Sequence, residues 1–234
     1  MPVRLSASSL VLFDIDGTLL RRAGPHHREA LIRAARKSTG LETSLEDVPV
    51  AGMLDRDILT AMLTVAGASK SLIQRSMPQM IAEAQRFYVR ECPNLRRKVC
   101  PGARALLYRL WRRGVPTGLV TGNLTRIGWK KMEQAGLKPY LRFGAFAELA
   151  KDRAGLVRIA IRHARREGWI GSKSRVTLIG DHPNDIRAAR ANGVQSVAVA
   201  TGVIAADELA EYNPDILVPD LLALKLETLL GDAG

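Results

Sequence analysis

Short apolar runs alternate with longer segments whose apolar residues recur at helical spacing along most of this chain. The runs are too short for helices, and several of them end in glycine or in polar turn residues. This alternation is typical of an α/β protein with a doubly wound parallel sheet, because helices then cover both faces of the strands. The predicted strands lie at 10–13, 115–120, 176–179, 196–199 and 216–218.

One long segment, 21–98, interrupts the alternation because it contains no clear strand. Its apolar spacing instead predicts helices over 28–39, 56–66 and 71–90. We therefore expect a smaller α-helical domain, 21–98, inserted after the first strand. The α/β core domain would then consist of 1–20 and 99–234.

The first predicted strand runs directly into two carboxylates, Asp14 and Asp16. Alternate side chains of a strand share a face, so both acids should point the same way. Two neighbouring carboxylates at the end of an apolar strand repel each other unless a cation or a shared proton compensates. The pair therefore indicates a bound metal, although strand-end aspartates also simply cap turns in contact with water.

Two later strand ends carry polar groups of a related kind. Thr121, Gly122 and Asn123 follow the second predicted strand, where a hydroxyl and backbone N–H groups can hold phosphoryl oxygens. Thr and Asn are also common helix N-caps. Asp181 follows the third predicted strand, and Asp185 lies in the first turn of the next helix. Asp185 could either cap that helix or hold a water molecule that is bound to the metal.

A cation is needed near these acids and near any phosphoryl group they bind. The segment 151–154 offers two candidates, Lys151 and Arg153. Arginine presents a planar fork and lysine a point charge, so either residue could serve.

The segment 13–19 resembles the first motif of the haloacid dehalogenase superfamily in its phosphatase form, with the sequence Phe-Asp-Ile-Asp-Gly-Thr-Leu. The segments 118–123 and 176–185 are similar to later motifs of that family, in the same order along the chain. The third motif is incomplete, because no proline follows Lys151. Arg153 is favoured as the cation of this motif, since some relatives carry an Asp-Arg pair with a leucine three residues later. Among relatives with a helical cap, the chain looks most like the phosphoglycolate phosphatases.

This resemblance implies a HAD-like, Rossmann-type core and assigns a role to each candidate residue. Asp14 would attack phosphorus, and Asp16 would protonate the leaving group and later activate water. Mg²⁺ would be held by Asp14, Asp181 and the Asp16 carbonyl, with Asp185 in a supporting position. Thr121, Gly122 and Asn123 would bind the phosphoryl oxygens.

The family resemblance also implies that the inserted helices form a lid over the active site and set its specificity. Arg56 is a candidate substrate contact, as is His26 or Arg22 near the first hinge.

The expected function is that of a magnesium-dependent phosphatase that hydrolyses a small phosphorylated metabolite through an aspartyl-phosphate. A sugar phosphomutase is one alternative, and a non-catalytic protein that binds a phosphate ligand is another. The net charge of +12 adds a further alternative, a protein that binds nucleic acid or removes phosphate from its ends. Arg158, Arg162 and Arg166, which are spaced to share one face of a helix, are candidate contacts for it. Nucleic acid ranks lower, because aromatic residues make up only 5% of the chain and do not interleave with basic ones.

No stretch of the sequence approaches the roughly 18 apolar residues of a membrane helix. Cys92 and Cys100 form no metal-binding pattern with the histidines. We therefore expect a cytoplasmic protein with no membrane partner. The sequence indicates no oligomeric state.

Overall fold

The first apolar run forms β1 (Ala7–Phe13), which lies inside a parallel six-stranded sheet of order β3-β2-β1-β4-β5-β6 in a computed structural model. The structure describes residues 7–21 and 24–230. The remaining strands are β2 (Thr117–Val120), β3 (Phe143–Ala145), β4 (Ile170–Gly180), β5 (Gln195–Val199) and β6 (Ile216–Val218). The α/β class with a doubly wound parallel sheet is therefore confirmed.

Strand β1 is buried on both faces, which explains why its sequence is a continuous apolar run rather than an alternating one. Leu10 and Leu12 join one hydrophobic cluster, whereas Val11 and Phe13 join another on the opposite face. Phe13 pairs with Leu119 of β2 on one side and with Ile179 of β4 on the other. These three strands therefore end level with one another.

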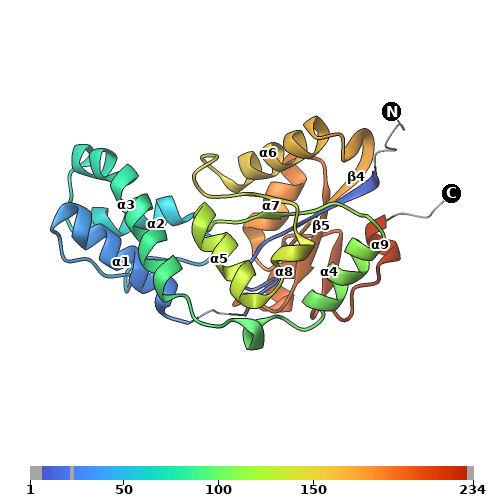
Figure 1. Cartoon of the computed structure of the whole chain (residues 1–234). Coiled ribbons are helices and arrows are strands. Elements are labelled where there is room, and N and C mark those ends of the chain that lie inside the picture. Colours follow the sequence, from blue (N-terminus) through green and yellow to red (C-terminus); the bar gives the residue numbers. More distant parts are fainter. Residues whose placement is uncertain (1–6, 22–23, 231–234) are drawn as a thin grey trace.

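Helices cover both faces of the sheet (Figure 1). One cluster receives apolar residues from α6 and α7, and the other receives them from α4 and α9. The bounds of the helices in this part of the chain are α4 (Ala103–Arg112), α5 (Thr125–Ala135), α6 (Arg153–Arg166), α7 (Pro183–Ala191), α8 (Ala206–Glu211) and α9 (Glu227–Leu230), with short 3-10 turns at η1 (Arg96–Lys98) and η2 (Lys138–Tyr140).

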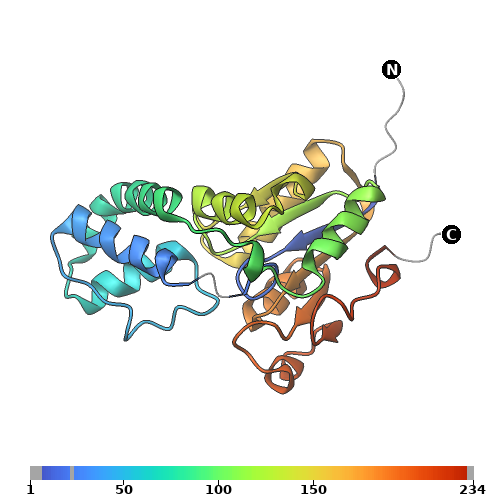
Figure 2. The same cartoon turned by 60° about the horizontal axis from the view of Figure 1, so that its bottom comes forward.

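The segment between β1 and α4 forms a separate group of helices beside the sheet. These are α1 (His26–Thr39), α2 (Asp55–Val65) and α3 (Lys70–Glu91). Figures 1 and 2 both show the group on one side of the molecule, with α5 between α3 and the sheet. The three helices lie within one or two residues of their predicted bounds. The division into a core domain and a cap domain stays a prediction.

Strand β3 was not predicted from the sequence. It has only three residues, and one of them is Gly144, which disfavours a strand on propensity alone. Its pairing with β2 supplies the backbone partners that stabilise it. None of the helices in the described ranges is long and apolar enough to cross a bilayer.

Candidate active site

Three polar residues that are distant in sequence meet at one edge of the sheet. Asp14 follows β1, Thr121 follows β2 and Asp181 follows β4. Because β1 lies between β2 and β4 and all three strands are parallel, their carboxyl ends are neighbours. In doubly wound sheets ligands bind outside this edge, at the point where successive strands are added on opposite sides.

Asp14, Asp181 and Asp185 form a buried carboxylate cluster, with one oxygen from each lying within 4.8 Å of the others. Burial raises the pKa of Asp181 well above its usual range, and the charges of Asp14 and Asp185 add to the effect. Burial likewise raises the pKa of Asp185, to about 7, against the opposing influence of Arg153. Three such acids can all be ionised at neutral pH only if a cation lies among them.

The turn after Asp16 is shaped to receive Asp181. Gly17 has a φ of +92°, and a β-carbon at this position would lie 2.0 Å from the nearer carboxylate oxygen of Asp181. The hydroxyl of Thr18 donates a hydrogen bond of 3.0 Å to the other oxygen. The Asp-Gly-Thr turn therefore both makes room for Asp181 and orients its carboxylate.

Arg153, the first residue of α6, reaches the cluster from the side. Its Nη1 lies 3.2 Å from Oδ1 of Asp14 and donates a hydrogen bond of 2.8 Å to Asp185. Asp152 caps α6 by accepting a hydrogen bond from the Gly155 N–H, which fixes the start of the helix. Lys151, the other candidate cation, is exposed. The structure thus brings Arg153, and not Lys151, against Asp14, while the catalytic role of either residue stays a prediction.

The Asp16 carboxylate turns away from the carboxylate cluster. It accepts hydrogen bonds from Asn123 Nδ2, at 2.8 Å, and from Lys131 Nζ, at 2.6 and 2.7 Å. Burial would raise the pKa of Asp16, but the charges of Lys131 and His27 and these hydrogen bonds lower it overall. The Asp16 side chain is therefore directed at Asn123 and Lys131, and metal binding through its carbonyl stays a prediction.

The three residues after β2 lie where the sequence predicted a phosphoryl contact. Thr121 is fully buried, and its hydroxyl accepts a hydrogen bond of 2.8 Å from Asn123 Nδ2. A β-carbon on Gly122 would lie 2.4 Å from the carbonyl oxygen of Met53, which belongs to the loop before α2. Gly122 thus permits a close approach between that loop and the site.

The loop before α2 covers the site through backbone contacts. The Gly52 carbonyl accepts a hydrogen bond of 2.9 Å from Asn184 Nδ2, and the Asp55 N–H donates one of 2.8 Å to the Gly122 carbonyl. Oδ2 of Asp55 accepts a further hydrogen bond of 2.8 Å from the Leu124 N–H. We call residues 50–55 the covering loop.

Two predicted substrate contacts lie next to this loop. Arg56 is half-buried in the first turn of α2, and its Nε is buried without a hydrogen-bond partner among the described residues. His26 begins α1, and its Nδ1 is also buried and unpartnered within the described ranges. Arg22 lies outside the described residues.

Three residues of the site were missed by the sequence analysis, namely Lys131, His27 and Asp55. Lys131 lies on the buried face of α5, together with Ile127 and Met132. The sequence did contain one signal for Lys131, because a lysine occupies a position at which the helical spacing predicts an apolar residue.

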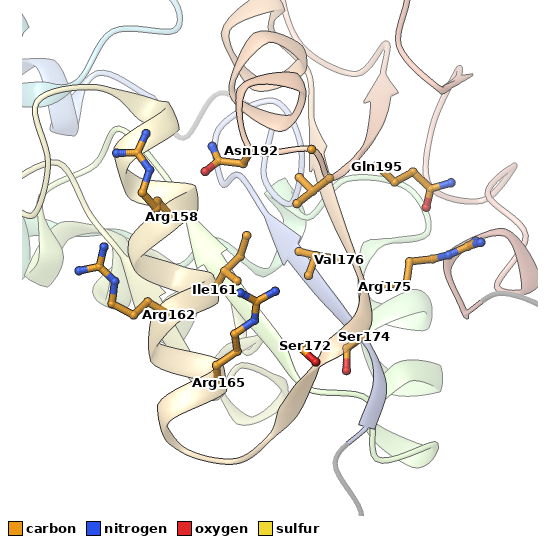
Figure 3. A pocket seen from close by; sticks show the side chains of 12 residues that line it. Arg158, Ile161, Arg162, Arg165, Ser172, Ser174, Arg175, Val176, Asn192 and Gln195 are labelled. Atoms are coloured by element: carbon orange, nitrogen blue, oxygen red, sulfur yellow. The ribbon is translucent and has the colours of Figure 1, made fainter.

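An arginine-lined groove of about 670 Å³ lies elsewhere on the molecule (Figure 3). Arg158, Arg162 and Arg165 of α6 and Arg175 of β4 contribute to it, whereas Arg166 instead contacts Glu167 and His163. The groove includes Ser172, near the start of β4, whereas Asp181 follows the end of that strand. At about 3.3 Å per residue, Ser172 lies up to roughly 30 Å from Asp181, whereas Arg158, at the other end of the groove, is only five residues after Arg153 on α6.

Comparisons with known proteins agree with this architecture. A protein-family model described as a haloacid dehalogenase-like hydrolase matches residues 9–193. A phosphoglycolate phosphatase of Pseudomonas syringae pv. tomato is 28% identical over 242 residues, covering 95% of this chain and 83% of that protein. The β-phosphoglucomutase of Clostridium difficile has a TM-score of 0.68 at 19% identity, with 94% of each chain covered. A predicted phosphoglycolate phosphatase from Haemophilus somnus has a TM-score of 0.65 at 18% identity, covering 91% of this chain and 94% of that one. Because the family model spans most of the sequence, this chain belongs to the haloacid dehalogenase-like hydrolases.

Proposed function

We propose that this chain is a magnesium-dependent phosphatase that hydrolyses a small organic phosphate monoester through an aspartyl-phosphate on Asp14. The observation that carries the proposal is the carboxylate cluster of Asp14, Asp181 and Asp185 with Arg153 against it. Acids and a fixed arginine in this arrangement match the needs of phosphoryl transfer, which depends on positioning and on neutralising charge. The hydrolase family and the phosphatase relatives support the same reaction class.

The residues of the cluster fit a divalent cation. Oδ1 of Asp14 is buried and, apart from the ion pair with Arg153 at 3.2 Å, has no hydrogen-bond partner among the described residues, so it can still contact a cation. Asp14, Asp181 and the Asp16 carbonyl would hold Mg²⁺, and Asp185 would fix their surroundings through Arg153. When bound, the ion would neutralise the phosphoryl oxygens and keep Asp14 ionised.

Asp14 is the proposed nucleophile because it ends the central strand among the phosphate-binding candidates. The Arg153 guanidinium would balance the charge that develops on the phosphoryl oxygens. The Thr121 hydroxyl and the Gly122 and Asn123 backbone would hold the remaining oxygens after releasing their present contacts. These residues together would orient phosphorus for in-line attack by the Asp14 carboxylate.

Asp16 is the proposed acid and base. In the first step its carboxyl, which has to take up a proton although Lys131 lowers its pKa, would give that proton to the leaving oxygen of the ester, and in the second step it would take a proton from the water that attacks the aspartyl-phosphate. Its position two residues after Asp14 puts both groups at the same strand end.

A small substrate is favoured by the covering loop. Asp14 and Asp181 are only 6% and 5% exposed, and the covering loop contacts Gly122 and Asn184 beside them, so we expect entry to require movement of this loop and of the helices behind it. We propose that α1–α3 act as the cap and that Arg56 contacts the far end of the substrate. Phosphoglycolate, the substrate named for the relatives, is the first candidate, because its carboxylate suits an arginine.

Phosphate release from a panel of small phosphate esters tests the proposal, with Mg²⁺ and with a chelator. Wild type should release phosphate only with the metal, and Asp14→Asn should abolish release while leaving the circular dichroism spectrum unchanged. Comparable turnover by Asp14→Asn would exclude it as the nucleophile. Isomerised sugar phosphate without release would instead establish the mutase alternative, for which the fold of the β-phosphoglucomutase is the supporting observation.

A further inference from the structure

Lys131 is the most deeply buried cation of the site, with a side-chain exposure of 1%. Its Nζ lies 2.7 Å and 2.6 Å from the two oxygens of Asp16 and 2.6 Å from Oδ1 of Asn123. It also lies 3.2 Å from Nδ1 of His27. An ammonium group so buried needs acceptors for its three hydrogens, and these three residues supply them.

The contact with His27 joins this group to the helices of the proposed cap. His27 is on α1, and its Nε2 lies 3.0 Å from Oδ2 of Asp55, at the start of α2. One tautomer satisfies both contacts: Nδ1 accepts from Lys131, and the hydrogen on Nε2 is donated to Asp55. Asp55 in turn binds the N–H of Leu124, immediately before α5.

A chain of contacts therefore runs from Asp16 through Lys131 and His27 to Asp55, and returns to the core at Leu124. Both ends of this chain are on the sheet side, and its middle is on helices α1 and α2. If those helices withdrew, Lys131 would lose the His27 acceptor. The ammonium would then be held only by Asp16 and Asn123, so its position and that of the Asp16 carboxylate would be less restrained.

Asp16 itself has little else to hold it in place. Its side chain is 39% exposed, against 8% for Asp14, so its orientation depends on specific contacts rather than on close packing. Lys131 contacts both carboxylate oxygens, and Asn123 contacts one of them. Without Lys131 the carboxylate would retain a single hydrogen bond and could rotate about its side-chain bonds.

We propose that Lys131 is a positioning residue that aims the Asp16 carboxyl at the leaving oxygen, and that His27 makes this alignment depend on closure of the cap. The inference rests on the proposed phosphatase function. It gives Lys131 a role in the first chemical step without direct contact with the substrate. It also explains why a lysine occupies the buried face of α5.

The leaving group separates positioning from a general structural role. Glycolate leaves phosphoglycolate as an alkoxide that needs a proton, whereas p-nitrophenolate leaves without one. Lys131→Met, which preserves the length of the side chain, should slow first-turnover release of glycolate about 100-fold and release of p-nitrophenol less than about 10-fold. Lys130→Met is the matched control, because Lys130 is the adjacent residue and pairs only with Glu133 at the surface of the same helix. It should leave both rates unchanged.

An equal fall in the release rates of both esters in Lys131→Met, or no fall in either rate, would overturn the positioning role. A crystal structure of Lys131→Met gives a second readout, because the Asp16 carboxylate should leave its wild-type position; an unchanged position would contradict the proposal. The same structure also excludes a folding defect as the cause of lost activity.

The link to the cap is tested with His27→Phe, which keeps the edge-on ring packing against Tyr88 but removes both hydrogen bonds. Hydrogen exchange at the amides of Asp55 and Leu124 should accelerate about tenfold, because closure is less stable. Unchanged exchange would exclude the link. These structural readouts do not need turnover, so if wild type releases no phosphate the proposed function fails while the positioning inference is still decided.

Discussion

Arg153 spans Asp14 and Asp185 with a single guanidinium nitrogen, at 3.2 Å from the first and 2.8 Å from the second. Asp14 follows β1 and Asp185 lies in the first turn of α7, and a residue at the start of α6 connects them. Asp185 also accepts a hydrogen bond of 3.2 Å from the His182 N–H in a capping box at the start of α7. The nucleophile candidate is therefore tied to two helix starts through one arginine.

Replacing Arg153 should impair catalysis much more than folding. In Arg153→Met the transition-state charge loses its fixed cation, and kcat should fall about 100-fold or more. Lys151→Met removes the neighbouring exposed cation and should leave kcat unchanged. Steady-state kinetics on one ester with both variants measure the contrast. Loss of activity in Lys151→Met with an active Arg153→Met would reverse the assignment.

Gly17→Ala should destroy the metal site. The φ of +92° strains any other residue by about 1–3 kcal/mol, and the new methyl group would occupy the position of the Asp181 carboxylate. Calorimetric titration with Mg²⁺ should show no binding under conditions where wild type binds. Gly168→Ala is a suitable comparison, because Gly168 also has a positive φ but a β-carbon there would meet nothing within 4 Å. Wild-type affinity in Gly17→Ala would show that the turn does not position Asp181.

The raised pKa values of Asp181 and Asp185 predict a pH effect on stability in the absence of metal. The folded protein keeps a proton on Asp185 from about pH 4 to about pH 7, a range in which the unfolded chain has released it, and Asp181 shifts in the same direction. The free energy of unfolding contributed by these groups is thus present below that range and is lost as pH rises through it. Without Mg²⁺, the melting temperature of wild type should fall from about pH 5 to about pH 8 more than that of Asp185→Asn.

Mg²⁺ should restore most of the stability that is lost at the higher pH, because the ion compensates the repulsion between ionised carboxylates. Thermal unfolding of both proteins with the metal and with a chelator measures the effect. Burial lowers the pKa of His182, whose titration works in the opposite direction, so the difference between the two proteins is the quantity to compare. Equal pH dependence in wild type and Asp185→Asn would contradict the prediction.

Arg56 should affect substrate binding rather than chemistry. Arg56→Met removes a charged hydrogen-bond donor, which corresponds to about a tenfold or greater rise in KM for phosphoglycolate. The KM for an ester without a carboxylate should change little, and kcat should stay similar for both. Arg28→Met, an exposed replacement on α1, serves as the control. An equal rise in KM for both esters would remove Arg56 from the contact with the far end of the substrate.

The sheet and the strand-end acids were predictable because both follow from short-range patterns. A buried parallel strand reads as an apolar run, and the acid that follows it in sequence also follows it in space, as Asp14 and Asp181 do. The Lys131 contacts were not predictable in this way. They join residues 104 and 115 positions apart, and no local pattern encodes which helix face will meet His27 or Asp16.

The choice between Lys151 and Arg153 shows a similar limit on a smaller scale. Both cations fit the chemistry, and only the start of α6 at Arg153, capped by Asp152, decides which one turns inward. Strand β3 was not predicted because its three residues together carry little strand propensity, and its pairing with β2 is what stabilises it. Tertiary contacts therefore determine these two features, which the local sequence does not specify.

The covering loop is held over the site largely through its main chain, at the carbonyl of Gly52 and the N–H of Asp55. Such contacts do not depend on the identity of most side chains in the loop. The close approach of Met53 to Gly122 is likewise made by its carbonyl oxygen, whereas its side chain packs separately against a hydrophobic cluster. Selection or engineering could therefore change which ester the enzyme prefers without altering the backbone contacts that hold the loop in place. Substrate preference and closure can then evolve separately.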